Sequence, residues 1–260
     1  MYFLFADETN TQPKYNEGVK FFVYGGLIIP GNKLLEMDEE ICRLRKKYGY
    51  RNEDSLKFDT NSRPVHLSKE DFAKIKHDVV ALCIRLECKL LLYVVLHKIA
   101  RSKGLSTTIK WGADCIFQKF NNYLLEKESS GMAFVDRMSD TSEYKILTEK
   151  FTVGLKYSTG TTSLNKIRLY ASSCDNASHF NSVADVVLGT FRYCINRPFN
   201  TGAAKVMMKN IIKLLWSVRI RPGVLDPFER GLTFSPRRQK DAAYKAEYDN
   251  LTKQLNALLS

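Results

Sequence analysis

The sequence lacks the features that mark several large classes of protein. Its longest uninterrupted apolar run is Leu90–Leu96, seven residues, which is too short to cross a bilayer as a helix. The six cysteines are scattered without a C-x-x-C pair, which argues against a zinc ribbon or a disulfide framework and favours reduced, buried thiols. No basic segment precedes the first apolar residues, which end at Asp7, so we expect no signal peptide. These absences predict a cytoplasmic protein.

Familiar catalytic signatures are missing as well. The chain contains no G-x-x-x-x-G-K-[ST], G-x-G-x-x-G, G-x-S-x-G or H-E-x-x-H pattern, so nucleotide-binding loops, serine hydrolases and zinc peptidases have no support. Histidine is scarce, and its four copies lie far apart in the sequence. His179 stands just before an expected helix, where it fits either a general base or a capping side chain.

What the chain has in excess is positive charge. Forty Lys and Arg against 28 Asp and Glu give a formal net charge of +12, which favours a polyanionic partner, either nucleic acid or an anionic membrane surface. The excess is uneven, because residues 197–260 hold 12 Lys and Arg against 5 Asp and Glu. We therefore predict a main domain over residues 1–196 and a basic helical C-terminal extension over residues 197–260, and we favour nucleic acid as the partner.

The extension carries a basic segment that suits contact with a phosphate backbone. Phe228 and Phe234 lie among its charges and could stack on the bases of a single strand. The alternative is a solubilising surface loop. Arg192, in the preceding helix, is either a further phosphate contact or an exposed helical arginine. The predicted nucleic-acid-binding residues are Arg192, Arg219, Arg221, Arg230, Arg237, Arg238 and Lys240.

Hydrophobic patterning predicts a mixed α/β fold. Strands are expected over residues 2–6, 21–30, 89–97, 131–136 and 167–171. Helices are expected over residues 32–48, 68–84, 103–125, 142–157, 181–195 and 203–218, and from about residue 240. A starting hairpin followed by alternating helices and strands is typical of a mixed sheet with helices on both faces.

The last expected helix has one apolar seam, formed by residues at a 4-3-4-3 spacing. Such a seam predicts either docking on the core of the same chain or a helix–helix contact in a homodimer. Its members are Tyr244, Tyr248, Leu251, Leu255 and Leu258.

Three aspartates stand beside dense apolar sequence. Asp7 ends the first strand, Asp136 ends a later strand, and Asp185 lies in the first turns of the 181–195 helix. A carboxylate in such surroundings needs a compensating partner, and strand ends of α/β sheets are where ligands collect. Magnesium and manganese are hard cations that bind carboxylate oxygens, and two such ions can hold both oxygens of a phosphodiester displacement. Taken alone, each aspartate fits a turn or a helix cap better.

The segments around these aspartates resemble one known family. Phe3–Asn10 with the following strand Phe22–Pro30, the strand end Phe134–Arg137 and the stretch Cys174–Gly189 resemble, in this order, motifs of the domain of unknown function 3800 family. The resemblance covers about residues 1–196. It implies a ribonuclease-H-like fold in which carboxylates from the first strand, a later strand and the last helix form a two-metal site. It therefore implies that Asp7, Asp136 and Asp185 hold Mg²⁺ or Mn²⁺.

Two positions depart from the family pattern. Ser55 stands where the family has Glu; if that Glu is a metal ligand in relatives, either Glu53 or Asp54 replaces it here or the site is depleted. Ser182 stands where the family has Gln, which removes an amide from the neighbourhood of Asp185. These departures bear on activity more than on fold.

Three further residues complete the expected site. Glu8 is a second-choice ligand, since strand alternation points it away from the sheet face of Asp7. Lys57 either neutralises a developing negative charge on the phosphate or is a solvated loop lysine. Gly189 lies one turn after Asp185 and would let their helix approach the sheet closely.

Two functions remain open on the sequence. The leading hypothesis is a metal-dependent nuclease that hydrolyses phosphodiester bonds in DNA or RNA. The alternative is a non-catalytic subunit of the same fold that binds nucleic acid or joins a complex, such as one in a bacterial or mobile-element defence system.

Overall fold

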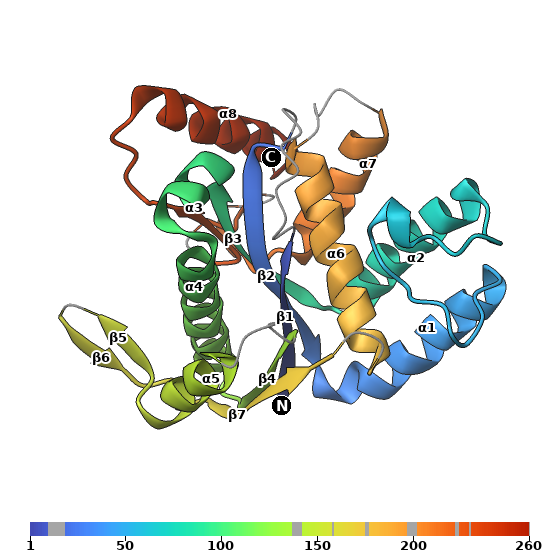
Figure 1. Cartoon of the computed structure of the whole chain (residues 1–260), viewed down its shortest axis with the longest axis horizontal. Coiled ribbons are helices and arrows are strands. Elements are labelled where there is room, and N and C mark those ends of the chain that lie inside the picture. Colours follow the sequence, from blue (N-terminus) through green and yellow to red (C-terminus); the bar gives the residue numbers. More distant parts are fainter. Residues whose placement is uncertain are drawn as a thin grey trace.

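The fold is built around one mixed β-sheet of six strands, in the order β10-β3-β2-β1-β4-β7 (Figure 1). This computed structural model describes residues 1–9, 19–136, 142–157, 159–174, 177–196, 202–221, 224–228 and 230–259. The prediction of a mixed α/β fold is confirmed. The strands of the sheet are β1 Tyr2–Thr9, β2 Phe21–Pro30, β3 Lys89–Leu96, β4 Gly131–Asp136, β7 Ile167–Ser173 and β10 Leu232–Ser235.

Strand direction makes the two ends of the strands chemically different. β2 runs antiparallel to both β1 and β3, whereas β1 pairs with β4, β4 with β7 and β3 with β10 in parallel. All strands of this sheet except β2 therefore run the same way, and their carboxyl ends lie along one side of the sheet. We call this line of strand ends the carboxyl edge; the term does not refer to an outermost strand. The opposite edge is called the amino edge. Ligands of α/β sheets collect at the carboxyl edge.

Helices cover both faces of the sheet, which Figure 1 shows nearly edge-on. Alternation along β1 divides its side chains, because Phe5 joins one buried cluster while Leu4 and Ala6 join another. Among the described helices, none combines the length and apolar character that a membrane crossing needs. The first cluster includes α1 Leu34–Lys47, α2 Lys69–Arg85, α6 His179–Asn196 and α7 Gly202–Ile211, and the second includes α3 His97–Lys103, α4 Leu105–Glu126 and part of α5 Ser142–Thr152.

Glycines account for two differences from the helices predicted by sequence. The helix expected over 103–125 is α4, which begins only at Leu105 because Gly104 has a φ of +83° that a helix interior does not allow. The short helix α3 before Gly104 was not expected. The helix expected over 142–157 ends early, and Gly154 with a φ of +92° leads the chain into a hairpin. The strands of that hairpin are β5 Leu155–Tyr157 and β6 Gly160–Thr162.

The residues after 196 are not a purely helical extension. After α7 and the 3-10 turn η3 Ile212–Leu214, the chain forms a hairpin and then β10, which joins the sheet beside β3. The apolar side chain of Leu232 is fully buried in the first cluster, so this part of the chain completes the core. The remaining elements of this part are β8 Val218–Arg221, β9 Val224–Asp226 and α8 Ala242–Leu259.

The apolar seam of α8 packs on the core of its own chain. Tyr248, Leu251 and Leu255 are 4%, 3% and 0% exposed, so the predicted docking is confirmed. The Tyr248 ring contacts Phe21 and Phe234, with ring centroids 5.6 and 5.5 Å apart. Because the same chain covers this seam, nothing supports the predicted homodimer contact through it.

Replacing Tyr248 by Phe should destabilise the fold by about 1–3 kcal/mol. The Tyr248 hydroxyl accepts a hydrogen bond from the Leu96 amide at 2.9 Å and donates one to the Ser235 carbonyl at 2.6 Å. Phenylalanine keeps the ring contacts but leaves the amide without its acceptor at the end of β3. Urea unfolding of both proteins measures the difference, and an unchanged midpoint would show that the hydroxyl does not anchor α8.

Candidate functional site

Two of the predicted aspartates lie side by side at the carboxyl edge. β1 and β4 pair in parallel with Ala6 opposite Val135, so the next residues, Asp7 and Asp136, are neighbours across the two strands. Alternation places both carboxylates on the sheet face that α6 covers, in line with the stacked rings of Phe5 and Phe134, whose centroids are 5.2 Å apart.

The third aspartate reaches the same face from α6. Asp185 lies on this helix, which packs directly on β1 and β2. The close approach requires Gly25 on β2, because a Cβ atom there would lie 2.3 Å from Cδ2 of Leu188. The prediction that Gly189 allows this approach is wrong, since a Cβ atom at Gly189 would instead meet the ring of Phe58 at 2.3 Å. Gly25 fits α6 to the sheet, whereas Gly189 makes room for the loop that carries Phe58.

The Phe58 peptide links this loop to the predicted site. Its N–H donates to Oδ2 of Asp185 at 2.6 Å, and its carbonyl accepts from Nζ of Lys76 at 2.6 Å. Lys76, on α2, is 6% exposed and its ammonium lies 4.6 and 3.8 Å from the ring centroids of Phe58 and Phe72. Burial lowers the pKa of Lys76 to about 8, although the charges of Asp185 and Asp59 oppose that shift. Sequence reasoning missed Lys76; its position on the apolar face of α2 was the available signal.

Several neighbouring charged side chains change the pKa of Asp7. Burial raises the pKa of Asp7 well above its ordinary value, and the negative charges of Asp136, Glu8 and Asp185 raise it further. The positive charge of Lys57 acts in the opposite direction. Lys57 is therefore a half-buried lysine near a cluster of carboxylates rather than a fully solvated one. This arrangement has an excess of negative charge that a bound cation would relieve.

Glu8 lies on the other face of the sheet. β1 continues to Thr9, and Glu8 pairs with Tyr24, whose ring belongs to the cluster beneath α4. The negative charge of Glu8 raises the pKa of Asp7. Burial raises the pKa of Tyr24, and the charges of Glu8 and Asp7 raise it further. Glu8 thus influences the carboxylate cluster through the sheet while its side chain starts on the opposite side.

A small pocket opens beside the paired strand ends. Its lining includes Asp7, Asp136 and Asn181, together with the apolar residues Phe5 and Ala6. The side-chain amide of Asn181 donates to Oγ of Ser173 at 2.8 Å and to the carbonyl of Cys174 at 3.1 Å. Asn181 thus supplies an amide one position before Ser182, which is itself buried. Asn181 is visible in the sequence, but whether residue 181 or residue 182 faces the pocket depends on how α6 is rotated about its own axis.

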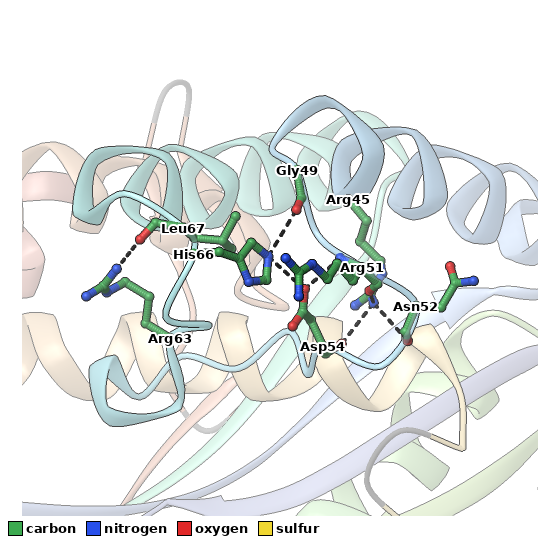
Figure 2. Close-up of polar contacts among 8 residues, drawn as sticks. All are labelled: Arg45, Gly49, Arg51, Asn52, Asp54, Arg63, His66 and Leu67. Atoms are coloured by element: carbon green, nitrogen blue, oxygen red, sulfur yellow. Dashed lines mark hydrogen bonds and ion pairs between the residues drawn. The ribbon is translucent and has the colours of Figure 1, made fainter.

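The loop between α1 and α2 is held together by its own polar contacts (Figure 2). Arg45 donates to the carbonyls of Arg51 and Asp54 at 2.7 and 2.8 Å, and His66 lies 3.2 Å from the Asp54 carboxylate. The Asp54 side chain also accepts from the Arg51 amide at 2.6 Å. Asp54 therefore belongs to this loop network, and Glu53 is exposed. Among the contacts of the described residues, none brings Glu53 or Asp54 to the position where the family has Glu and this chain has Ser55.

β10 divides the basic segment between the two edges of the sheet. Arg237, Arg238 and Lys240 are exposed and follow the carboxyl end of β10, at the same edge as Asp7. Three strand spacings, about 14 Å, separate β10 from β1. Arg230 precedes β10 at the amino edge, where it pairs with Glu126 and lies 5.1 Å from the Trp216 ring centroid.

The remaining predicted phosphate contacts have mixed surroundings. Arg219 is exposed on β8, whereas the side chain of Arg221 lies outside what the structure describes. Arg192 is half-buried, not an exposed helical arginine; burial lowers its pKa and the charges of Asp185 and Asp59 oppose this. Phe228 and Phe234 are partly buried and pack on each other with centroids 5.8 Å apart, which covers part of each ring; stacking on bases stays a prediction.

The residues at the carboxyl edge suit a hard divalent cation. Asp7 and Asp136 line the pocket, and the charges of Asp136 and Asp185 both act on Asp7; carboxylate oxygens of this kind are ligands that Mg²⁺ and Mn²⁺ bind. Burial and like charges raise the pKa of Asp7, and a cation bound beside it would offset both effects by favouring the ionised carboxylate. No thiol or imidazole is among the residues lining the described pocket.

Comparisons with known proteins give no family. No family model and no curated protein matches the chain. Among solved structures, the chain is similar to ribonuclease H2 from Pyrococcus horikoshii OT3, at 13% sequence identity and a TM-score of 0.37. The similarity spans 97% of this chain and 100% of that chain. At this identity and TM-score it carries no argument about fold or activity.

Proposed function

We propose that the chain is a metal-dependent nuclease of ribonuclease-H-like fold, with Asp7, Asp136 and Asp185 as ligands of Mg²⁺ or Mn²⁺. One observation carries the proposal: two neighbouring strands and α6 bring these three carboxylates to one face of the carboxyl edge. The sequence resemblance to the domain of unknown function 3800 family agrees with the same three residues and remains part of the proposal.

The chain's own groups have distinct tasks in this reaction. Bound metal would supply a nucleophilic water of lowered pKa and neutralise charge on the phosphate. The Phe58 amide donates to one oxygen of Asp185 and so orients its carboxylate. Lys76 anchors the Phe58 carbonyl and so holds Lys57 beside Asp7, where its ammonium stabilises negative charge developing on the substrate.

The nucleic-acid strand would run along the carboxyl edge. Exposed Arg237, Arg238 and Lys240 lie at this edge, and the span from β10 to β1 is about 14 Å. Arg230 precedes β10 at the amino edge, and Arg219 lies on β8, earlier in the chain. We therefore expect both to hold the substrate less directly.

The alternative function is a non-catalytic nucleic-acid-binding or complex-forming subunit. The observation that favours it is the commitment of Asp54 to the loop network around Arg45 and His66, which leaves the Ser55 position without an acidic substitute. Metal binding separates the two functions. The alternative predicts salt-sensitive binding of nucleic acid without stabilisation by Mn²⁺ or Mg²⁺.

The direct test is a cleavage panel of single- and double-stranded DNA and RNA with Mn²⁺ or Mg²⁺. We expect one substrate class to be cut by the wild type and left intact by Asp136→Asn, which keeps the shape of the side chain. Asp78→Asn is the matched control, because that carboxylate binds Lys47 and Tyr48 away from the carboxyl edge. Cleavage that survives Asp136→Asn, or an inactive wild type across the panel, would contradict the nuclease proposal.

Charge at the carboxyl edge should dominate substrate binding. Replacing Arg237, Arg238 and Lys240 together by Gln should weaken binding and reduce the slope of log K against log salt by about 2 to 3. The matched control is the pair Arg219→Gln and Arg230→Gln, for which we expect a smaller change in slope. Fluorescence anisotropy across a salt series measures both, and equal slopes for the two variants would contradict substrate placement along the carboxyl edge.

A further inference from the structure

A second cluster of potential ligands lies between α1 and the start of α6, outside the carboxylate site. Asp38 and Cys42 are one turn apart on α1, and His179 is the first residue of α6. Their ligand atoms all lie within 4.8 Å of one another, and all three residues are partly exposed. Carboxylate, thiol and imidazole therefore converge from two helices, and Cys42 and His179 are 137 residues apart in sequence.

Asp38 and Cys42 both contact the same atom, Nδ1 of His179. Nδ1 of His179 lies 3.0 Å from Oδ1 of Asp38 and 3.7 Å from Sγ of Cys42. A carboxylate acceptor requires a hydrogen on that nitrogen, whereas a thiol donor requires its lone pair. With the hydrogen on Nδ1, the carboxylate takes the shorter contact and the sulfur, a weak acceptor, is left with at most a share of that hydrogen. A cation bound at Nδ1 would satisfy the nitrogen, the carboxylate and the thiolate together.

The distances and ligand types fit a tetrahedral borderline-soft cation. With zinc bonds of about 2.0–2.3 Å to oxygen, nitrogen and sulfur, neighbouring ligand atoms in a tetrahedron are about 3.4–3.6 Å apart. The distances from Nδ1 of His179 to Oδ1 of Asp38 and to Sγ of Cys42, 3.0 and 3.7 Å, lie close to this range. Three protein ligands leave a fourth position, and the side chains of Asp38 and His179 are 49% and 28% exposed, so solvent can reach it.

We propose that Asp38, Cys42 and His179 form a zinc site that joins α1 to the first turn of α6. This site differs in chemistry from the carboxylate cluster, because a thiolate and an imidazole select Zn²⁺ over Mg²⁺. Zinc replaces the thiol proton of Cys42, and that proton leaves to solvent on binding. The site is independent of the nuclease proposal, although its α6 ligand lies six residues before Asp185.

Cobalt(II) is the probe, since it takes the place of zinc and a bound thiolate gives it an intense sulfur-to-metal charge-transfer absorption. We expect the full-length chain to develop this absorption up to one Co²⁺ per chain, and Zn²⁺ to remove it. Cys42→Ser should abolish the band, and His179→Gln should weaken Co²⁺ binding by about 100-fold or more. Zn²⁺ at about 100 times its dissociation constant should raise the melting temperature of the wild type by about 5 °C or more.

Two matched variants make the test specific. Cys174→Ser removes an exposed cysteine from another position and should keep the charge-transfer band. Asp7→Asn removes a carboxylate of the proposed nuclease site and should also keep it, so the two proposals can fail separately. No charge-transfer band in the wild type, or an unchanged band in Cys42→Ser, would overturn the zinc site. Circular dichroism of the metal-free variants checks that they are folded.

Discussion

Replacing Asp7 by Asn should abolish metal-dependent cleavage and, in the absence of metal, make the protein more stable. Burial raises the pKa of Asp7, and the charges of Asp136, Glu8 and Asp185 raise it further. A raised pKa means that the ionised form is less favourable in the folded chain than in the unfolded chain. The wild type therefore loses stability as pH rises through the unfolded pKa of this carboxyl, and the uncharged variant escapes that loss.

The expected magnitudes are large enough to measure separately. Losing a metal ligand should lower the cleavage rate by about three orders of magnitude, which corresponds to about 4 kcal/mol of transition-state stabilisation. In the presence of a chelator, the melting temperature at pH 7 should rise by about 2–6 °C, for a gain of about 1–2 kcal/mol. Stabilisation by added Mn²⁺ should disappear in the same variant.

A carboxylate in a different environment provides the control for Asp7. Burial alone would raise the pKa of Asp78, but hydrogen bonds from Lys47 and Tyr48 outweigh it and lower that pKa. Asp78→Asn should therefore lower the melting temperature slightly and leave cleavage unchanged. If Asp7→Asn were less stable than the wild type without metal, the repulsion among the three carboxylates would not be the dominant effect at this position.

Replacing Gly25 by Ala should separate α6 from the sheet and inactivate the site without touching a carboxylate. The new Cβ atom would lie 2.3 Å from Cδ2 of Leu188 and 2.9 Å from the carbonyl oxygen of Leu91. Overpacking of this kind costs about 1–3 kcal/mol, because either the helix or the strand must move. Since Gly25 pairs with Asp7 on β1, the shift occurs beside the cluster itself. A displacement of about 1 Å can lower activity by about 100-fold.

Two further variants test this explanation. Leu188→Ala removes the side chain that the new Cβ atom would meet, so combining it with Gly25→Ala should restore part of the lost stability and activity. This non-additivity measures the coupling between the strand and α6. Gly202→Ala is the control, since an added Cβ atom there has no neighbour within 4 Å. Fully additive effects of Gly25→Ala and Leu188→Ala would contradict the steric explanation.

The strands, and the position of Asp7 and Asp136 at neighbouring strand ends, could be predicted because their signals are local. The run Leu90–Leu96 is apolar throughout and became β3, and Asp7 and Asp136 lie near or at the ends of apolar strands. The cap of α2 was also visible, and Ser68 Oγ does accept from the Asp71 amide at 2.9 Å. Such features depend on residues within one turn or one strand of each other.

The other parts of the site depend on packing that one sequence does not reveal. Lys76 is buried only because the loop carrying Phe58 folds over α2 and α6. The role of Gly25 requires the position of Leu188, which is 163 residues away in sequence. The basic segment looked continuous, but β10 divides it because a short apolar stretch pairs with β3. Long-range contacts of this kind leave no mark in local periodicity.

β10 covers one side of β3, which matters for any form of the chain that lacks the residues after 196. β10 pairs with β3 along Leu92–Val95, so a chain that stopped at residue 196 would leave the backbone groups of β3 without their partner. An open apolar strand at the side of a sheet is a template for pairing with other chains. By pairing with β3, the residues of β10 cover this template in the folded chain.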